Sequence, residues 1–166
     1  MAINFGNSTS LANVLSASWR ITSNFTGNQN PVTNNWERAD NTGTGNSYAN
    51  VLTESSGVFS FTYTGWYTVS WSHYCYGQSI DAYWCEMNMD ISPNSGSNWE
   101  TLGHTQGFIL SDSTMYQIPT RTLNFKIPNS NYRIRFGIVN NNGSVITAGS
   151  STKQHTGFII HKVAEV

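Results

Sequence analysis

The sequence has 166 residues, of which 38% are hydrophobic and only 10% are charged, and its formal net charge is −1. This length corresponds to a single domain with its own hydrophobic core, which excludes intrinsic disorder. The near-neutral charge, without any block of Lys or Arg, excludes nucleic acid and anionic membranes as partners. No apolar run is long enough to span a membrane, and residues 1–15 lack the features of a secretory signal, so we expect a soluble protein that is not exported.

Hydrophobic residues alternate with polar ones along most of the chain, and no stretch keeps the spacing of an amphipathic helix, which predicts an all-β protein. Residues 1–15 are expected to form an N-terminal arm, and residues 16–166 a single jelly-roll β-sandwich of about eight to ten antiparallel strands. In chain order, the alternation predicts strands at 16–22, 58–64, 66–76, 82–91, 99–102, 107–110, 121–128, 132–138 and 155–163.

Local features suggest how some of these strands are connected. A short polar turn separates strands 66–76 and 82–91, so we expect one long hairpin there. The Asn142-Gly143 pair is typical of a second hairpin turn. Residues 23–50 are rich in Asn, Thr and Gly and predict a long loop. Strand 155–163 is apolar on both sides, which indicates a central strand or a subunit contact.

Six residues in the middle of the chain follow the spacing L-x6-F-x5-G-x-Y-x-V-x-W, namely Leu52, Phe59, Gly65, Tyr67, Val69 and Trp71. This spacing resembles the signature of the C1q/TNF-like jelly-roll family. The segment around Gly157 near the C-terminus is similar to the last strand of that family. Two positions depart from the pattern, because Val69 stands where the family has Phe and Ser47 stands at an acidic or amide position. The resemblance implies a C1q/TNF-like fold, a homotrimer and no catalysis.

The N-terminal arm is similar to short segments of phage fibre and virion-surface proteins, through its I-x-F-G-x-S/T run. This likeness favours a bacteriophage virion protein that is made in the host cytoplasm and functions outside it. Our preferred hypothesis is a capsid decoration, or cement, protein that stabilises the shell by binding the major capsid protein. The apolar residues expected to anchor the arm on the capsid are Ile3, Phe5, Leu11 and Val14.

Two other functions share the predicted fold. The alternative hypothesis is the receptor-binding head of a tail fibre or spike, which would recognise a host surface glycan with loops around 28–46 or 77–82. A secreted carbohydrate-binding module is disfavoured by the missing signal sequence. The chain has neither an H-E-x-x-H motif nor a G-x-S-x-G motif, so we expect no enzyme activity and no cofactor.

The two cysteines and one histidine are expected to project on one face if the 66–91 hairpin turns near Ile80. His73, Cys75 and Cys85 could then form a metal corner or a cross-strand disulfide, or the thiols could be free and buried beside a hydrogen-bonded histidine. A structural zinc site normally has four ligands with Cys-x2-Cys spacing. We therefore predict free thiols and no metal site.

Several aromatic residues alternate out of phase with the expected core. Exposed rings beside Asn and Gln can stack on sugars, but interface cores are also enriched in Tyr and Trp. We favour the second interpretation and predict that the trimer contact is formed by Trp66, Tyr74, Tyr76, Trp84, Phe158 and Ile160.

Overall fold

The computed structural model describes residues 15–39, 51–77, 83–109, 116–141 and 143–166. All the regular secondary structure in these ranges is β-strand, which confirms the all-β prediction. No helix that could cross a membrane is found in the described part of the chain. The strands are β1 (Ser16–Ile21), β2 (Phe25–Thr26), β3 (Trp36–Arg38), β4 (Leu52–Ser55), β5 (Val58–Phe61), β6 (Gly65–Ser72), β7 (Cys75–Gly77), β8 (Tyr83–Ser92), β9 (Glu100–Ile109), β10 (Tyr116–Gln117), β11 (Thr120–Ile127), β12 (Arg133–Asn140), β13 (Val145–Thr147) and β14 (Gly157–Ala164).

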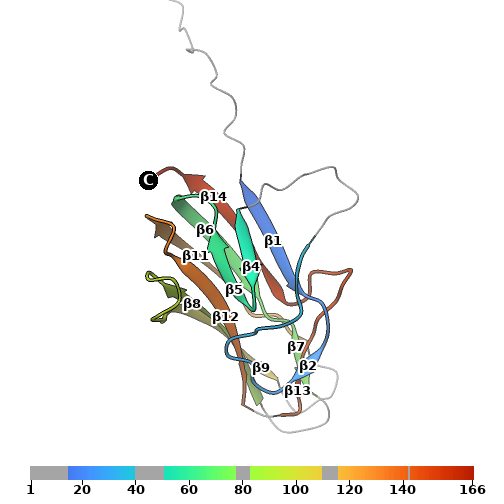
Figure 1. The fold of residues 1–166 in the computed structure, drawn as a ribbon. Helices are drawn as coiled ribbons and strands as arrows, with labels where there is room; N and C mark the ends of the chain where they lie inside the picture. The colour runs from blue at the N-terminus through green and yellow to red at the C-terminus, as the bar shows by residue number, and fades with distance from the viewer. Residues whose placement is uncertain (1–14, 40–50, 78–82, 110–115, 142) are drawn as a thin grey trace, which may run out of the picture.

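Two antiparallel five-stranded sheets form the sandwich (Figure 1). The first, which we call the β6 sheet, has the order β11-β6-β14-β1-β3, and the second, the β8 sheet, has the order β4-β5-β12-β8-β9. A small end sheet, β10-β7-β13-β2, lies at the end of the sandwich opposite the C-terminus (Figure 1). The predicted antiparallel sandwich is therefore confirmed, and the end sheet is an addition that the sequence pattern did not predict.

The core lies between the two five-stranded sheets, where alternate residues of each strand point inward. Phe59 of β5 and Phe136 of β12 meet Phe158 of β14, with ring centroids 4.9 Å (Phe59) and 4.5 Å (Phe136) from that of Phe158. The side chains of the central sequence motif also lie in this core, and Leu52, Phe59, Tyr67, Val69 and Trp71 are all buried.

The two glycines of the motifs stand where the backbone comes too close to a neighbour for a side chain. Gly65 has a φ of 150°, and a Cβ built on it would lie 2.6 Å from the carbonyl oxygen of Ala164. A Cβ on Gly157 would lie 2.2 Å from the carbonyl oxygen of Trp19 in the paired strand β1. Glycine is required at both positions because a backbone carbonyl cannot move away as the end of a side chain can.

Strand pairing differs from the sequence prediction in two places. The expected hairpin of 66–76 with 82–91 is wrong, because β6 pairs with β11 and β14 whereas β8 pairs with β9 and β12. The hairpin expected at Asn142-Gly143 is also wrong, because β13 pairs with β2 and β7 of the end sheet. Of the two alternatives for strand 155–163, a central strand or a subunit contact, the structure shows the first, since β14 lies between β6 and β1.

Two other segments are more regular than predicted. The two weak strands expected at 99–102 and 107–110 form one strand, β9, whose pairing with β8 shifts between Met89 and Asp90. The expected loop over 23–50 contains the short strands β2 and β3 and an isolated bridge between Gln29 and Ile138. Residues 40–50 and the arm up to residue 14 lie outside the described residues.

Replacing Gly157 with Ala should destabilise the fold by about 1–3 kcal/mol, because the new methyl group would collide with the backbone of β1. The measurement is chemical denaturation of the purified variant. Gly143→Ala is the matched control, since nothing lies within 4 Å of a Cβ at that position, and its stability should change by less than about 0.5 kcal/mol. Equal effects of the two variants would contradict the close approach of β14 and β1.

Candidate functional site

The aromatic residues predicted to form the trimer contact do not gather on one surface. Trp66 lies in β6 and is exposed, whereas Trp84 is half-buried in β8 of the opposite sheet. Tyr74 precedes β7 and Tyr76 lies within it, so both lie beside the end sheet, where their ring centroids are 6.5 Å apart. These four residues are therefore spread over three sheets and cannot all contribute to a single flat contact.

Phe158 and Ile160 cannot form a subunit contact, and this part of the prediction is wrong. Their side chains are only 1% and 0% exposed and belong to the core of the subunit. The apolar run on β14 points to both sides of the sheet, and it is the intervening Ile159, 40% exposed, that faces outward. The apolar run in the sequence does indicate an outward apolar residue on this strand, but that residue is Ile159 and not Phe158 or Ile160.

A row of uncharged side chains crosses the centre of the outward side of the β6 sheet. One row across the strands joins Ser18 of β1, Ile159 of β14, Ser70 of β6 and Thr122 of β11. We call this surface the contact face and define it as Ser18, Thr68, Ser70, Thr122, Asn124, Ile159 and His161.

The polar groups of the contact face are largely paired with one another. Thr68 donates a hydrogen bond to the side-chain oxygen of Asn124 at 2.6 Å, and the hydroxyls of Ser70 and Thr122 are 2.7 Å apart. Polar groups that already have a partner lose little when water is removed from above them. The ion pair between Arg20 and Glu37, 3.1 Å apart, lies at the edge of this sheet. A partner could therefore cover the Thr68–Asn124 and Ser70–Thr122 pairs without leaving their hydroxyl groups unpaired.

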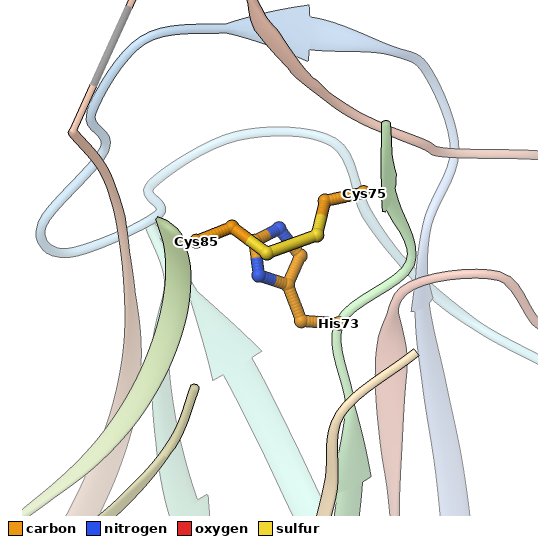
Figure 2. A group of neighbouring side chains, drawn as sticks. All are labelled: His73, Cys75 and Cys85. Carbon is orange, nitrogen blue, oxygen red and sulfur yellow. A yellow bond between two sulfur atoms is a disulfide. The ribbon is translucent and has the colours of Figure 1, made fainter. Parts of the chain in front are cut away.

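Cys75 and Cys85 are joined by a disulfide, so the prediction of free thiols is wrong (Figure 2). Both side chains are fully buried in a small second core with Ile109 and Val145. Cys75 lies in β7 of the end sheet and Cys85 in β8. The two strands lie in different sheets, so the disulfide does not arise from the 66–91 hairpin that would have placed the cysteines opposite each other.

The His73 side chain lies beside the disulfide and is completely buried (Figure 2). One ring nitrogen, Nε2, is 3.0 Å from the Thr147 hydroxyl, whereas Nδ1 has no hydrogen-bond partner within the described part of the chain. Burial lowers the pKa of His73 from 6.5 to about 3, because the charged imidazolium is poorly solvated inside the protein. His73 is therefore neutral in the folded protein near neutral pH.

The buried His73 should make the fold less stable in acid. The unfolded chain binds a proton at this histidine below about pH 6.5, whereas the folded chain does so only near pH 3. The stability contribution is thus fully present above pH 6.5 and is lost as the pH falls toward 3, by at most about 1.4 kcal/mol per pH unit. The measurement is the free energy of unfolding of the disulfide-bonded protein between pH 7 and 4.

His73→Gln should flatten this pH dependence, and His104→Gln, at an exposed position on β9, should leave it unchanged. Parallel curves for the wild type and His73→Gln would mean that His73 does not cause the acid sensitivity.

No protein-family model matches the chain, and no curated protein matches it in sequence. Its architecture nevertheless places it among the jelly-roll sandwiches. The TNF protein Eiger from S. frugiperda matches with a TM-score of 0.62 at 18% identity, over 92% of this chain and 94% of that one. Murine APRIL at pH 5.0 matches with a TM-score of 0.59 at 15% identity, over 89% and 98% of the two chains. The fold is therefore a C1q/TNF-like jelly roll, as the sequence motif predicted.

Proposed function

We propose that the chain is a non-enzymatic structural subunit that associates as a homotrimer through the contact face of the β6 sheet. The observation that supports this most directly is the exposed Ile159 beside two hydrogen-bonded side-chain pairs, Thr68–Asn124 and Ser70–Thr122. An exposed isoleucine surrounded by paired hydroxyl and amide groups is suited to burial against a second copy, because it contributes apolar area and the surrounding groups cost little to desolvate. The exposed Trp66 lies on the same sheet and extends this contact toward the end of β14.

The trimer proposal is tested by the native mass of the purified chain. Sedimentation velocity at micromolar concentration should give three times 18.4 kDa for the wild type. Ile159→Lys should give a monomer, because three buried ammonium groups would face one another near the threefold axis. Phe108→Lys is the matched control, since Phe108 is exposed on β9 of the opposite sheet, and it should remain trimeric. A monomeric wild type or a trimeric Ile159→Lys would overturn the proposed contact.

We further propose that the trimer decorates the capsid of a tailed bacteriophage and stabilises the shell by bridging major capsid proteins. The N-terminal arm would carry the capsid contact through its apolar residues, which lie outside the described residues. Several neighbouring contacts on a closed shell add binding free energy to the assembled state. The chain would then be made in the host cytoplasm and function on the virion.

Deleting residues 1–14 should abolish binding to undecorated capsids and leave the trimer intact. Leu15 is retained because its side chain packs against the core and its carbonyl oxygen accepts a hydrogen bond from the Lys162 N–H. The measurements are co-sedimentation with capsids and the native mass of the truncated chain. Capsid binding by the truncated trimer would show that the arm is not the anchor.

The alternative is a fibre or spike head that binds a host glycan, and one feature of the end sheet favours it. The ring centroids of Tyr74 and His155 are 5.0 Å apart, and the Asn24 amide donates to the Tyr76 hydroxyl at 3.2 Å. Half-exposed rings beside an amide are suited to stacking on a sugar. Saturable binding of the intact chain to host-cell glycans, together with no binding to capsids, would favour this function over decoration.

A further inference from the structure

We propose that His73, Cys75 and Cys85 form a zinc site when the Cys75–Cys85 disulfide is reduced. Each of the three residues offers one ligand atom, and these atoms lie within 4.8 Å of one another, with all three side chains buried. The imidazole lies beside the two sulfur atoms (Figure 2), and both cysteines belong to the small second core. Thiolate sulfur and imidazole nitrogen are the ligands that zinc prefers in proteins.

The hydrogen bonds of His73 leave one ring nitrogen free to coordinate. The Thr147 hydroxyl oxygen lies 3.0 Å from Nε2. We assign the proton to Nε2, because a proton on Nδ1 would be a buried donor without a partner among the described residues. Nδ1 then presents its lone pair and has no protein partner among the described residues. A metal-bound histidine normally donates its other ring N–H to such an acceptor, which fixes the ring in position.

The charge and the number of donors also suit zinc. Two thiolates and a neutral imidazole balance the two positive charges of the ion, so the site would be neutral in its buried surroundings. Zinc is usually four-coordinate, and the fourth position would be taken by water or by the Asn140 side-chain oxygen. That oxygen is buried without a partner, and Asn140 pairs with Cys85 in the ladder between β12 and β8.

The disulfide and the zinc site are alternative cross-links between the same two strands. A dithiol reductant of the thioredoxin class gives two electrons and two protons to the Cys75–Cys85 bond and becomes a disulfide itself. Zinc then displaces the two thiol protons, which pass to solvent, and binds both thiolates. In a reducing cytoplasm the zinc form would hold β7 against β8, and in an oxidising environment the disulfide would do so.

The test uses the full chain, reduced with a phosphine in metal-free buffer and titrated with Co²⁺ as a spectroscopic substitute for zinc. The reduced protein should bind one Co²⁺ per chain, with a thiolate-to-cobalt charge-transfer band that Zn²⁺ abolishes by competition. The oxidised protein should show no such band. X-ray absorption of the zinc-loaded protein should report two sulfur ligands together with nitrogen or oxygen ligands.

Variants separate the role of the histidine from that of the two thiols. Thr147→Val removes the hydrogen bond to Nε2 and should weaken metal binding by roughly 10–100-fold. His73→Gln removes a ligand and should weaken it further. His104→Gln, at an exposed position on β9, should bind the metal as the wild type does.

The proposal is overturned if the reduced chain shows no charge-transfer band, or if His73→Gln binds Co²⁺ as tightly as the wild type. Circular dichroism of each reduced variant reports whether it is folded. If His73→Gln does not fold, X-ray absorption of the zinc-loaded wild type decides the question, through two sulfur ligands and the multiple-scattering signal of one imidazole ring. A reduced wild type that unfolds and is not refolded by Co²⁺ or Zn²⁺ would also overturn the proposal.

Discussion

The stacking of Phe158 on Phe136 is the contact on which the two-layered structure depends. Phe158 lies in β14, the central strand of the β6 sheet, and Phe136 in β12, the central strand of the β8 sheet, and their ring centroids are 4.5 Å apart. Because both rings are buried between the layers, the neighbouring residues on each strand must point outward. This places Ile159 on the outer surface of the β6 sheet and Arg135 on that of the β8 sheet. The contact that joins the two sheets therefore also determines which side chains face outward from each of them.

The side of the sheet to which each residue points could be predicted from the sequence far better than the strand pairing. The sequence motif places Tyr67, Val69 and Trp71 at alternate positions, which share one side of a strand, and all three are buried. Alternation does not identify the neighbouring strand, because both sheets of a sandwich bury one side against the same core. Strands 66–76 and 82–91 therefore had the pattern of a hairpin, although β6 and β8 lie in opposite sheets.

The candidate sites were harder to predict because they join residues that are distant in the sequence. Ser70 and Thr122 are 52 residues apart in the sequence. Neither lies in a motif that would indicate an interface. Cys75 and Cys85 are only ten residues apart, but they lie in different sheets, because β7 pairs with β13 whereas β8 pairs with β12. A strand of three residues, such as β7, is too short to show an alternation of hydrophobic and polar residues. The end sheet and the burial of the disulfide therefore could not be predicted from the sequence.

The two outward faces of the sandwich differ in charge. This difference identifies the face that a second subunit could bury with the smaller desolvation free energy. On the β8 sheet, the buried carboxylate of Asp90 accepts a hydrogen bond from Arg135 at 2.9 Å, and the guanidinium group of Arg135 lies 4.2 Å from the ring centroid of Trp99. Burying this ion pair in an interface would cost free energy, because the charged groups would lose their contact with water and would gain no new hydrogen-bond partner. The central row of the contact face carries no ion pair, and beside Ile159 the side chains of Thr68 and Asn124, and of Ser70 and Thr122, are hydrogen-bonded to each other. Interface cores are depleted in charge for this reason, so self-association should use the β6 sheet and leave the β8 sheet in water.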